Sequence, residues 1–284
     1  VLEQLEFQEI NDALQSIHQP KTIEEGIYAR KRFSFEDLFT LQLFNLQEKE
    51  RLTKEVASPI HIQIEEIKTL LETLPFKLTT PQKNSLWEIV QDLGKNHPMN
   101  RLLQGDVGSG KTIVVATAAL LSARQEFQIA FMAPTEILAR QHYETMKKFF
   151  PATEVGLGLL TASESRAFYG ESLEHETKKP ELKEEIKKGN IKIVFGTHAL
   201  IQKDVNFKNL TLVIVDEQHR FGVRQRAELI KRKGGTPHFL SMSATPIPRT
   251  LSLTLWGNLE LSLINELPKN RQPITTKTID PKHR

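Results

Sequence analysis

The segment GDVGSGKT at 105–112 has the residue types and the spacing of a phosphate-binding loop. It follows the apolar run 101–104 and opens a helical pattern at 112–125, which is the setting that such loops occupy. Its glycines let the backbone amides face a phosphate, and the helix N-terminus adds positive potential. A lysine then reaches the β- and γ-phosphates, and the next hydroxyl ligates Mg²⁺. We therefore predict a magnesium–nucleotide site formed by Gly105, Gly108, Ser109, Gly110, Lys111 and Thr112.

Two acids, Asp216 and Glu217, end the apolar run 210–215. Burying unpaired charges is costly, and ligands of parallel sheets sit at the carboxyl ends of strands. If this strand lies beside the one that feeds the loop, Asp216 points at the Mg²⁺ and completes its shell through a water, and Glu217 orients or deprotonates the attacking water. We expect the acids to serve the cation and the water and to lack protein partners. A surface Asp–Glu turn is the alternative reading.

The rest of the chain supplies elements that could hold these groups at one edge of a sheet. Helical patterns at 112–125 and 135–150 alternate with short apolar runs at 101–104, 129–134, 191–196, 210–216 and 238–245. This alternation predicts an α/β fold, a mostly parallel sheet with helices on both faces. An N-terminal helical segment precedes it, and Thr22 with Glu25 forms a capping box there. We expect a helical linker region at 1–74, the α/β domain at 75–268 and a linker at 269–284.

Composition restricts the class of protein without identifying it. The chain has 284 residues, 39% of them hydrophobic, with 38 basic residues against 35 acidic ones and no cysteine. Cysteine-ligated zinc and disulfides are excluded, and the charge is too balanced to argue for nucleic acid by itself. No apolar stretch reaches the length of a membrane span and no signal sequence opens the chain. We expect a cytoplasmic protein, and the missing initiator Met suggests a start inside a longer chain.

Five segments in order carry a family resemblance: GDVGSGKT, APTEILARQH, GTHAL, VDEQHRFG and SMSATPIPRT. Their order and spacing resemble the first motor domain of superfamily 2 helicases over about residues 76–268. The resemblance implies a RecA-like P-loop domain that uses ATP and Mg²⁺.

The resemblance also gives nucleotide-linked roles to single residues. Lys111, Asp216, Glu217 and His219 would act in hydrolysis. Gln82 would read the adenine edge and Phe76 would pack on the ring, although taken alone this segment reads better as a helix-capping Thr-Pro turn. Ser243 and Thr245 would report the phosphate state by bonding His219 or Asp216. Gln218 would face a second domain, and Arg220 has no assigned role.

Nucleic-acid contacts are implied in the same way. Thr135 and Arg140 stand where this family contacts the nucleic-acid backbone, and a hydroxyl or a guanidinium suits phosphate oxygens. The backbone of Gly196 and Thr197 would likewise meet a phosphate. Arg224 opens the basic stretch 224–233, a candidate second contact. For Arg140 and for the basic stretch 224–233, a plain solvated surface is the alternative.

A narrower resemblance, carried by VDEQHRFGVRQR and the ending ELPKNRQPITT, points to the RecG family of bacterial branched-DNA helicases. It implies an ATP-driven motor that reverses forks and migrates Holliday junctions in recombination and repair. A wedge domain and a second RecA-like domain would complete that motor, so we expect these 284 residues alone to hydrolyse ATP hardly at all. The alternatives are a transcription-repair coupling translocase, a non-motor nucleotide-binding module and an RNA helicase. Ala162 and Pro81 depart from the family pattern, and Ala162 would be strained if its turn needed positive φ.

Overall fold

The computed structural model describes residues 7–170, 174–197, 200, 204–216, 235–244 and 259–267. The chain forms two compact units. A helical unit contains residues 1–54 and 247–260, and an α/β unit contains residues 55–246 and 261–284. Each unit is described by itself below.

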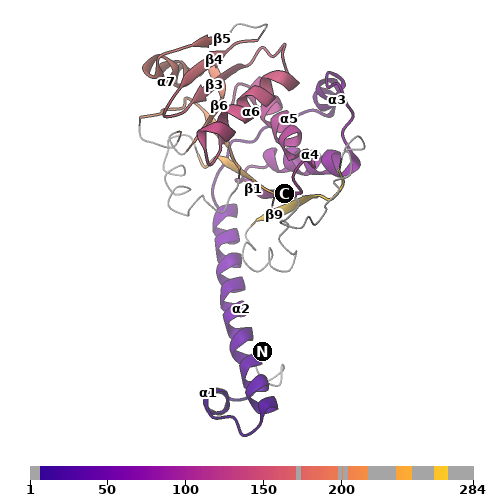
Figure 1. Ribbon diagram of the computed structural model, residues 1–284, viewed down its shortest axis with the longest axis vertical. Helices are drawn as coiled ribbons and strands as arrows, with labels where there is room; N and C mark the ends of the chain where they lie inside the picture. Colours follow the sequence, from indigo (N-terminus) through magenta and orange to yellow (C-terminus); the bar gives the residue numbers. More distant parts are fainter. Residues whose placement is uncertain are drawn as a thin grey trace, which may run out of the picture. The chain divides into compact units, whose positions relative to one another are not determined.

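The helical unit consists, in its described part, of α1 (Ile10–His18) and α2 (Ile23–Thr53), which fold back beside each other (Figure 1). Thr22 caps α2, since its hydroxyl accepts from the Glu25 amide over 3.2 Å. This is the helix start that the sequence predicts. The Ser16 hydroxyl of α1 donates to Glu25 over 3.0 Å and ties the two helices together.

One sheet runs through the α/β unit. In the described chain it has nine strands in the order β5-β4-β3-β6-β2-β7-β8-β1-β9. The strands are β1 (Asn100–Gly105), β2 (Gln128–Met132), β3 (Gly156–Leu160), β4 (Ser165–Phe168), β5 (Glu174–Glu176), β6 (Ile191–Gly196), β7 (Leu210–Asp216), β8 (His238–Ser243) and β9 (Glu260–Ile264). The pairs from β3 through β6, β2, β7 and β8 to β1 are parallel, and β4 and β5 extend the sheet antiparallel.

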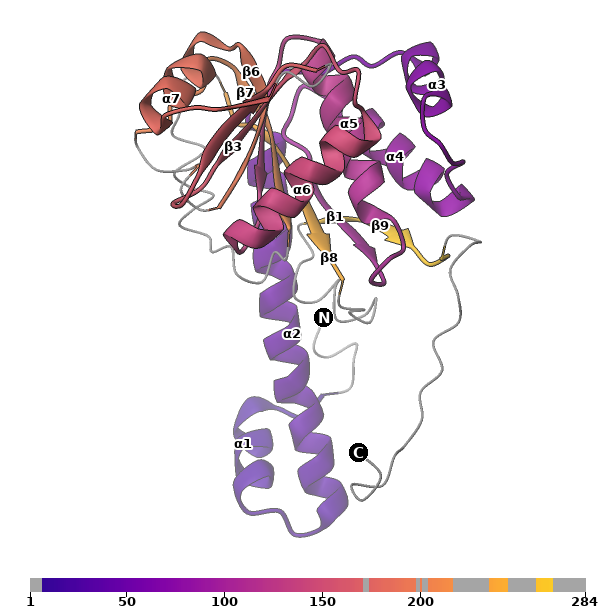
Figure 2. The same cartoon turned by 45° about the horizontal axis from the view of Figure 1, so that its top comes forward.

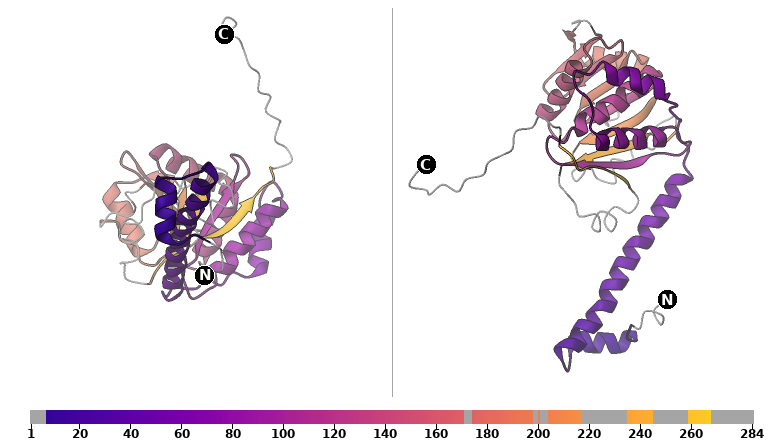
Figure 3. Two further views of the ribbon diagram at one scale, coloured as in Figure 1. Left: turned by 90° about the horizontal axis from the view of Figure 1, so that it is seen from below. Right: turned by 90° about the vertical axis from the view of Figure 1, so that its right-hand side faces the viewer.

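Helices cover both faces of this sheet, as the sequence predicts (Figures 2 and 3). The helices are α3 (Ile64–Glu72), α4 (Thr80–Leu93), α5 (Lys111–Arg124), α6 (Glu136–Phe149) and α7 (Lys179–Lys188). Alternate residues of β2 face the two helical layers: Ile129 and Phe131 belong to a core with α3 to α6, whereas Ala130 and Met132 belong to a second core with α7. The two-sided burial explains why the parallel strands read as continuous apolar runs.

Residues 55–74 contribute to the α/β unit. Ile67 and Leu70 of α3 belong to its larger core, and the Ile60 amide bonds the Leu93 carbonyl oxygen over 2.8 Å. The domain boundaries given above for 1–74, 75–268 and 269–284 stay predictions.

Strand register brings the candidate chemistry to one edge. Gln104 at the end of β1 is level with Ser243 at the end of β8, and Asp216 at the end of β7 pairs with Met242. The phosphate-loop sequence follows β1, and Thr135 begins α6 three residues after β2 ends. These groups therefore share the carboxyl edge of the parallel strands, where ligands bind in open α/β sheets.

Candidate nucleotide-binding site

The loop between β1 and α5 has the backbone that its glycines predict. Gly108 and Gly110 have φ values of 81° and 85°, in the left-handed region that favours glycine. Gly110 is the residue at which α5 begins its first turn, so the helix N-terminus opens onto the loop. A Cβ on Gly105 would come within 2.6 Å of the Ser109 hydroxyl and 2.9 Å of the Ile264 carbonyl oxygen. Tight packing against β9 therefore excludes a side chain at position 105.

Lys111 reaches back into this loop. Its ammonium donates to the carbonyl oxygens of Gly105 over 2.6 Å and Asp106 over 3.0 Å. The Ser109 hydroxyl is fully buried and has no hydrogen-bond partner within the described structure. Thr112 follows in the first turn of α5 and is half-buried. An ammonium, two hydroxyls and a glycine-shaped backbone at a helix N-terminus fit a magnesium-bound triphosphate.

Gln82 fastens the loop to α4. Its Oε1 accepts from the Thr79 amide over 2.8 Å, and its Nε2 donates to the Ser109 carbonyl oxygen over 2.8 Å. Thr79 caps α4 with Pro81 in the first turn, so the helix-capping reading of this segment is correct and Pro81 causes no strain. Both ends of the buried Gln82 amide are engaged by protein, and its contact with adenine stays a prediction.

Phe76, the second residue predicted to meet the base, is 42% exposed. Its ring meets the edge of Phe149 of α6 at a centroid distance of 5.9 Å. Stacking of this partly exposed ring on a base also stays a prediction.

Asp216 has a protein partner that the sequence analysis missed. The Nε2 of His142 in α6 lies 2.8 Å from the Asp216 Oδ2, and the two side chains are 10% and 16% exposed. The expectation that this carboxylate lacks protein partners is therefore wrong. A signal was available, since Ala139, His142, Tyr143 and Met146 form the buried face of α6 at helical spacing. What sequence periodicity could not show is which strand end that face meets.

The Mg²⁺ role of Asp216 is predicted on the condition that its strand lies beside the strand that feeds the loop, and the structure does not meet that condition. β7 does not lie beside β1, because β8 runs between them. Ser243, the predicted coupling residue, ends this intervening strand and is buried. Asp216 is consequently two strands away from the phosphate loop, at the same edge of the sheet.

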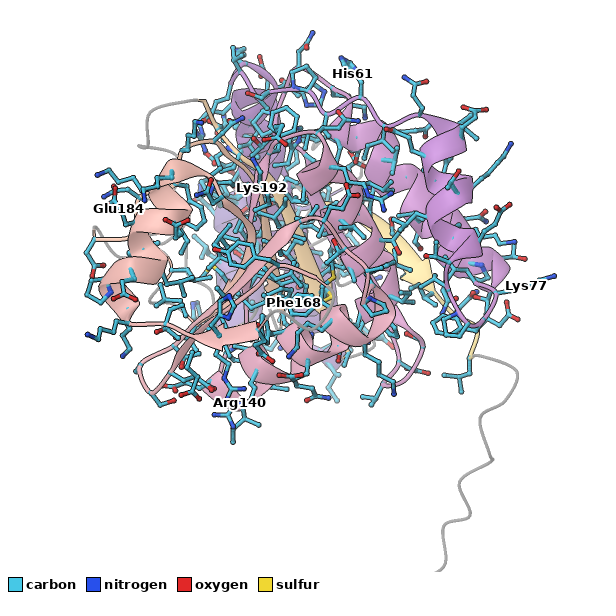
Figure 4. The ribbon with its side chains drawn as sticks, turned by 90° about the horizontal axis from the view of Figure 1, so that it is seen from above. His61, Lys77, Arg140, Phe168, Glu184 and Lys192 are labelled. Carbon is cyan, nitrogen blue, oxygen red and sulfur yellow. The ribbon has the colours of Figure 1, made fainter. Side chains whose placement is uncertain are left out.

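The predicted nucleic-acid contacts lie on two neighbouring elements. The Thr135 hydroxyl caps α6 by accepting from the Leu138 amide over 3.3 Å. Arg140 reaches outward at the rim of the unit (Figure 4), 52% exposed, and its Nε bonds the Glu164 carboxylate over 2.5 Å. Thr197 directly follows β6 and is half-buried. The phosphate contacts of these residues stay predictions, and Arg140 would exchange an acidic partner to make one.

The turn at 161–164 contacts the start of α6. Glu136 accepts hydrogen bonds from the Ser163 hydroxyl and from the Ser163 amide, the latter over 3.1 Å. The Ser163 hydroxyl lowers the pKa of the Glu136 carboxyl from its ordinary value, so the carboxyl stays ionised. Ala162 is not strained, since Glu126 alone among the described non-glycine residues has a positive φ.

Several predicted site residues lie outside the described residues. They are Glu217, Gln218, His219, Arg220, Arg224 and Thr245. Their roles in hydrolysis, coupling and DNA contact stay predictions.

Comparison with known proteins identifies the class. Residues 79–254 match the DEAD/DEAH box helicase family, and the chain belongs to that family. Membership implies use of a nucleotide. A structure of the helicase MrfA bound to DNA, 19% identical with a TM-score of 0.53 over 75% of this chain and 31% of that one, shares the fold.

Within that class the similarity is to RecG. ATP-dependent DNA helicase RecG of Synechocystis sp. is 45% identical over 285 residues, 100% of this chain and 33% of the relative. RecG of Aquifex aeolicus is 43% identical, over 98% of this chain and 35% of that protein. A structure of RecG bound to a three-way DNA junction superposes with a TM-score of 0.80 at 40% identity, covering 96% of this chain and 35% of that one.

These comparisons confirm the resemblance to RecG and the RecA-like fold. They do not favour the transcription-repair translocase or the non-motor module. The chain spans about a third of the length of the curated relatives it matches. None of the described helices is both long and apolar enough to cross a membrane.

Proposed function

We propose that this chain is the first RecA-like motor domain of an ATP-dependent DNA helicase that remodels branched DNA. The observation that carries the proposal is the shared carboxyl edge of the sheet, where β1 leads into the loop 105–112 and β7 ends at Asp216. The similarity to RecG, one structure of which is bound to a three-way DNA junction, supports branched DNA as the substrate. Fork reversal and Holliday-junction migration in recombination and repair are the activities we assign to the longer protein.

In this proposal each group at the edge has a distinct task. Lys111 leaves the carbonyl oxygens of its own loop to bind the β- and γ-phosphates, and the amides around Gly108 and Gly110 hold the same oxygens. Thr112 and Asp216 would hold Mg²⁺, which would neutralise charge on the phosphates. Glu217 orients the attacking water and takes up its proton as water adds to the γ-phosphorus and the bond to ADP breaks.

In our proposal, hydrolysis at the full rate also needs an arginine from a second motor domain of the longer protein. The relatives are about three times longer, and a second motor domain would add an arginine that contributes about 10³ to 10⁵ in rate. A wedge domain would engage the fork. We also propose a cytoplasmic location, where DNA and ATP are both present in bacteria.

The test compares ATP hydrolysis by this chain and by the longer protein, each with forked and with linear DNA. The chain alone should show a low rate that DNA barely changes. The longer protein should respond more strongly to forks, and Glu217→Gln should abolish that response. Stimulation that needs neither Glu217 nor a branch would overturn the proposal, as would full turnover by this chain alone.

A further inference from the structure

The contact between His142 and Asp216 joins the helix of the predicted nucleic-acid contacts to the strand that ends at the predicted Mg²⁺ ligand. His142 belongs to α6, the helix that carries Thr135 and Arg140, whereas Asp216 ends β7. A carboxylate oxygen only accepts hydrogen bonds, so the His142 Nε2 carries the hydrogen and donates it across the 2.8 Å. The donated bond occupies Oδ2 and restricts rotation of the carboxylate.

The imidazole is itself held in place. Its ring lies 4.6 Å from the ring of Phe131 in β2, and Phe131 stacks on Phe195 of β6 at 5.1 Å. Phe131 pairs in register with Ile214 of β7, the strand that ends at Asp216. Because the imidazole is nearly buried and packs against the Phe131 ring, it has little freedom to follow a moving carboxylate.

We propose that His142 is a positioning residue that sets the orientation of Asp216 for a magnesium–nucleotide and links that orientation to α6. The proposal rests on the proposed function, since Asp216 is taken there as the Mg²⁺ ligand. Removal of a side chain that hydrogen-bonds a metal ligand typically lowers metal affinity about 10- to 100-fold. Because Thr135 and Arg140 are on the same helix, a shift of α6 on nucleic-acid binding changes the bond to Asp216. By linkage, Mg-nucleotide binding then changes nucleic-acid affinity by the same factor.

The alternative is a histidine that only fills space between α6 and the sheet. Two variants separate the cases. His142→Phe keeps a ring against Phe131 and removes the donor, and His142→Gln keeps a donor at a similar reach. His175→Phe is the matched control, because His175 lies on β5 and its ring contacts Tyr169 at 6.2 Å, at the other end of the sheet.

The first measurement is the affinity for a fluorescent ADP analogue, with Mg²⁺ and with EDTA, after thermal melting has shown that each variant folds. His142→Phe should weaken binding about 10-fold or more in Mg²⁺ and leave it unchanged in EDTA. His142→Gln should recover most of the Mg²⁺ effect, and His175→Phe should match the wild type. Equal losses in Mg²⁺ and EDTA, or no loss, overturn the positioning role. A wild type that is indifferent to Mg²⁺ contradicts the proposed function instead.

The second measurement adds a forked oligonucleotide to the same titrations in Mg²⁺. The wild-type affinity for the analogue should change when DNA is present, and the change should shrink towards none in His142→Phe. A wild type whose affinity ignores DNA, or a His142→Phe variant with the full change, overturns the link to α6.

Discussion

The Gln82 side chain bonds the Ser109 carbonyl oxygen through Nε2 and the Thr79 amide through Oε1, each over 2.8 Å. One amide thereby caps α4 and holds the phosphate loop. The contact leaves no room on the loop side, because a Cβ on Gly110 would lie 2.3 Å from the Gln82 Nε2.

Gly110→Ala should therefore both strain the loop and break the contact with Gln82. The left-handed φ of 85° alone costs an alanine about 1–2 kcal/mol, and displacing Gln82 adds to that. Urea denaturation measures the loss, and nucleotide affinity should fall in the same variant. The matched control is Gly94→Ala, where φ is −76° and the nearest atom to a Cβ is 3.6 Å away. A Gly110→Ala variant as stable as the control would contradict this account.

Lys111→Ala should weaken nucleotide binding by about 10- to 100-fold, since hydrogen bonds to a charged group are worth about 1.5–3 kcal/mol. The Lys111 ammonium already lies in the loop and exchanges its two carbonyl contacts for the phosphates. Equilibrium titration with a fluorescent nucleotide measures the change. Lys77→Ala, at an exposed position (Figure 4), is the control and should bind as the wild type does. Equal affinities in the two variants would show that Lys111 does not bind the nucleotide.

These two sites show how far sequence reasoning reaches. The phosphate loop is local in sequence, so residue types at fixed spacing predict both its backbone and its setting between a strand and a helix. The order of the sheet strands is not local. From the sequence, adjacency of the Asp216 strand and β1 is only a condition, and in the structure β8 separates them, because the run 238–245 inserts between two strands that precede it in the chain.

His142 illustrates the same limit for a side chain. Helical periodicity places it on the buried face of α6, but its bond to Asp216 joins residues that are 74 positions apart. Only the packing of α6 on the sheet decides which strand end it meets. Gln82 is an intermediate case. Its part in capping α4 can be predicted from the local sequence TTPQ, whereas its hydrogen bond to Ser109 cannot.

A buried ionic cluster that joins α4, β1 and β9 should contribute most of the stability at the β9 end of the sheet. Arg101 of β1 bonds the buried Asp92 of α4 over 2.8 Å, and it also reaches Glu88 over 3.1 Å and Ser262 of β9 over 2.8 Å. Asp92→Ala leaves the Arg101 charge buried without its main partner and should cost about 3–5 kcal/mol in unfolding free energy. Calorimetry or urea denaturation measures it. Lys187→Ala, which breaks only an exposed pair, should change stability very little. Similar small losses in both variants would refute the cluster's role.

His238 should make the α/β unit sensitive to acid. It is fully buried, accepts from the Met99 amide over 3.0 Å and donates to the Ser58 carbonyl oxygen over 3.1 Å. Burial lowers the pKa of its imidazole below the ordinary value of 6.5. The unfolded chain therefore takes up this proton first, so stability is full above about pH 7 and falls as the pH drops through about 6.5.

The measurement is the urea midpoint between pH 7.5 and 5.5 in the wild type and in His238→Gln. The variant should be less stable at pH 7.5 and should lose less of its stability on acidification. His61→Gln, at an exposed histidine, should follow the wild type at every pH. An identical pH dependence in all three proteins would show that His238 does not carry the effect.

The central claim is that the carboxyl edge of the sheet binds a nucleotide and its magnesium together. Asp216 of β7 is the carboxylate that joins Thr112 of the phosphate loop in holding the metal. The most direct test is the ratio of nucleotide affinities with Mg²⁺ and with EDTA, in the wild type and in Asp216→Asn. We predict a wild-type ratio of about 10 or more, from the charge-assisted contacts that the metal adds. In Asp216→Asn the ratio should fall close to one while the affinity in EDTA is retained. An Asp216→Asn variant that keeps the full wild-type ratio would contradict the account.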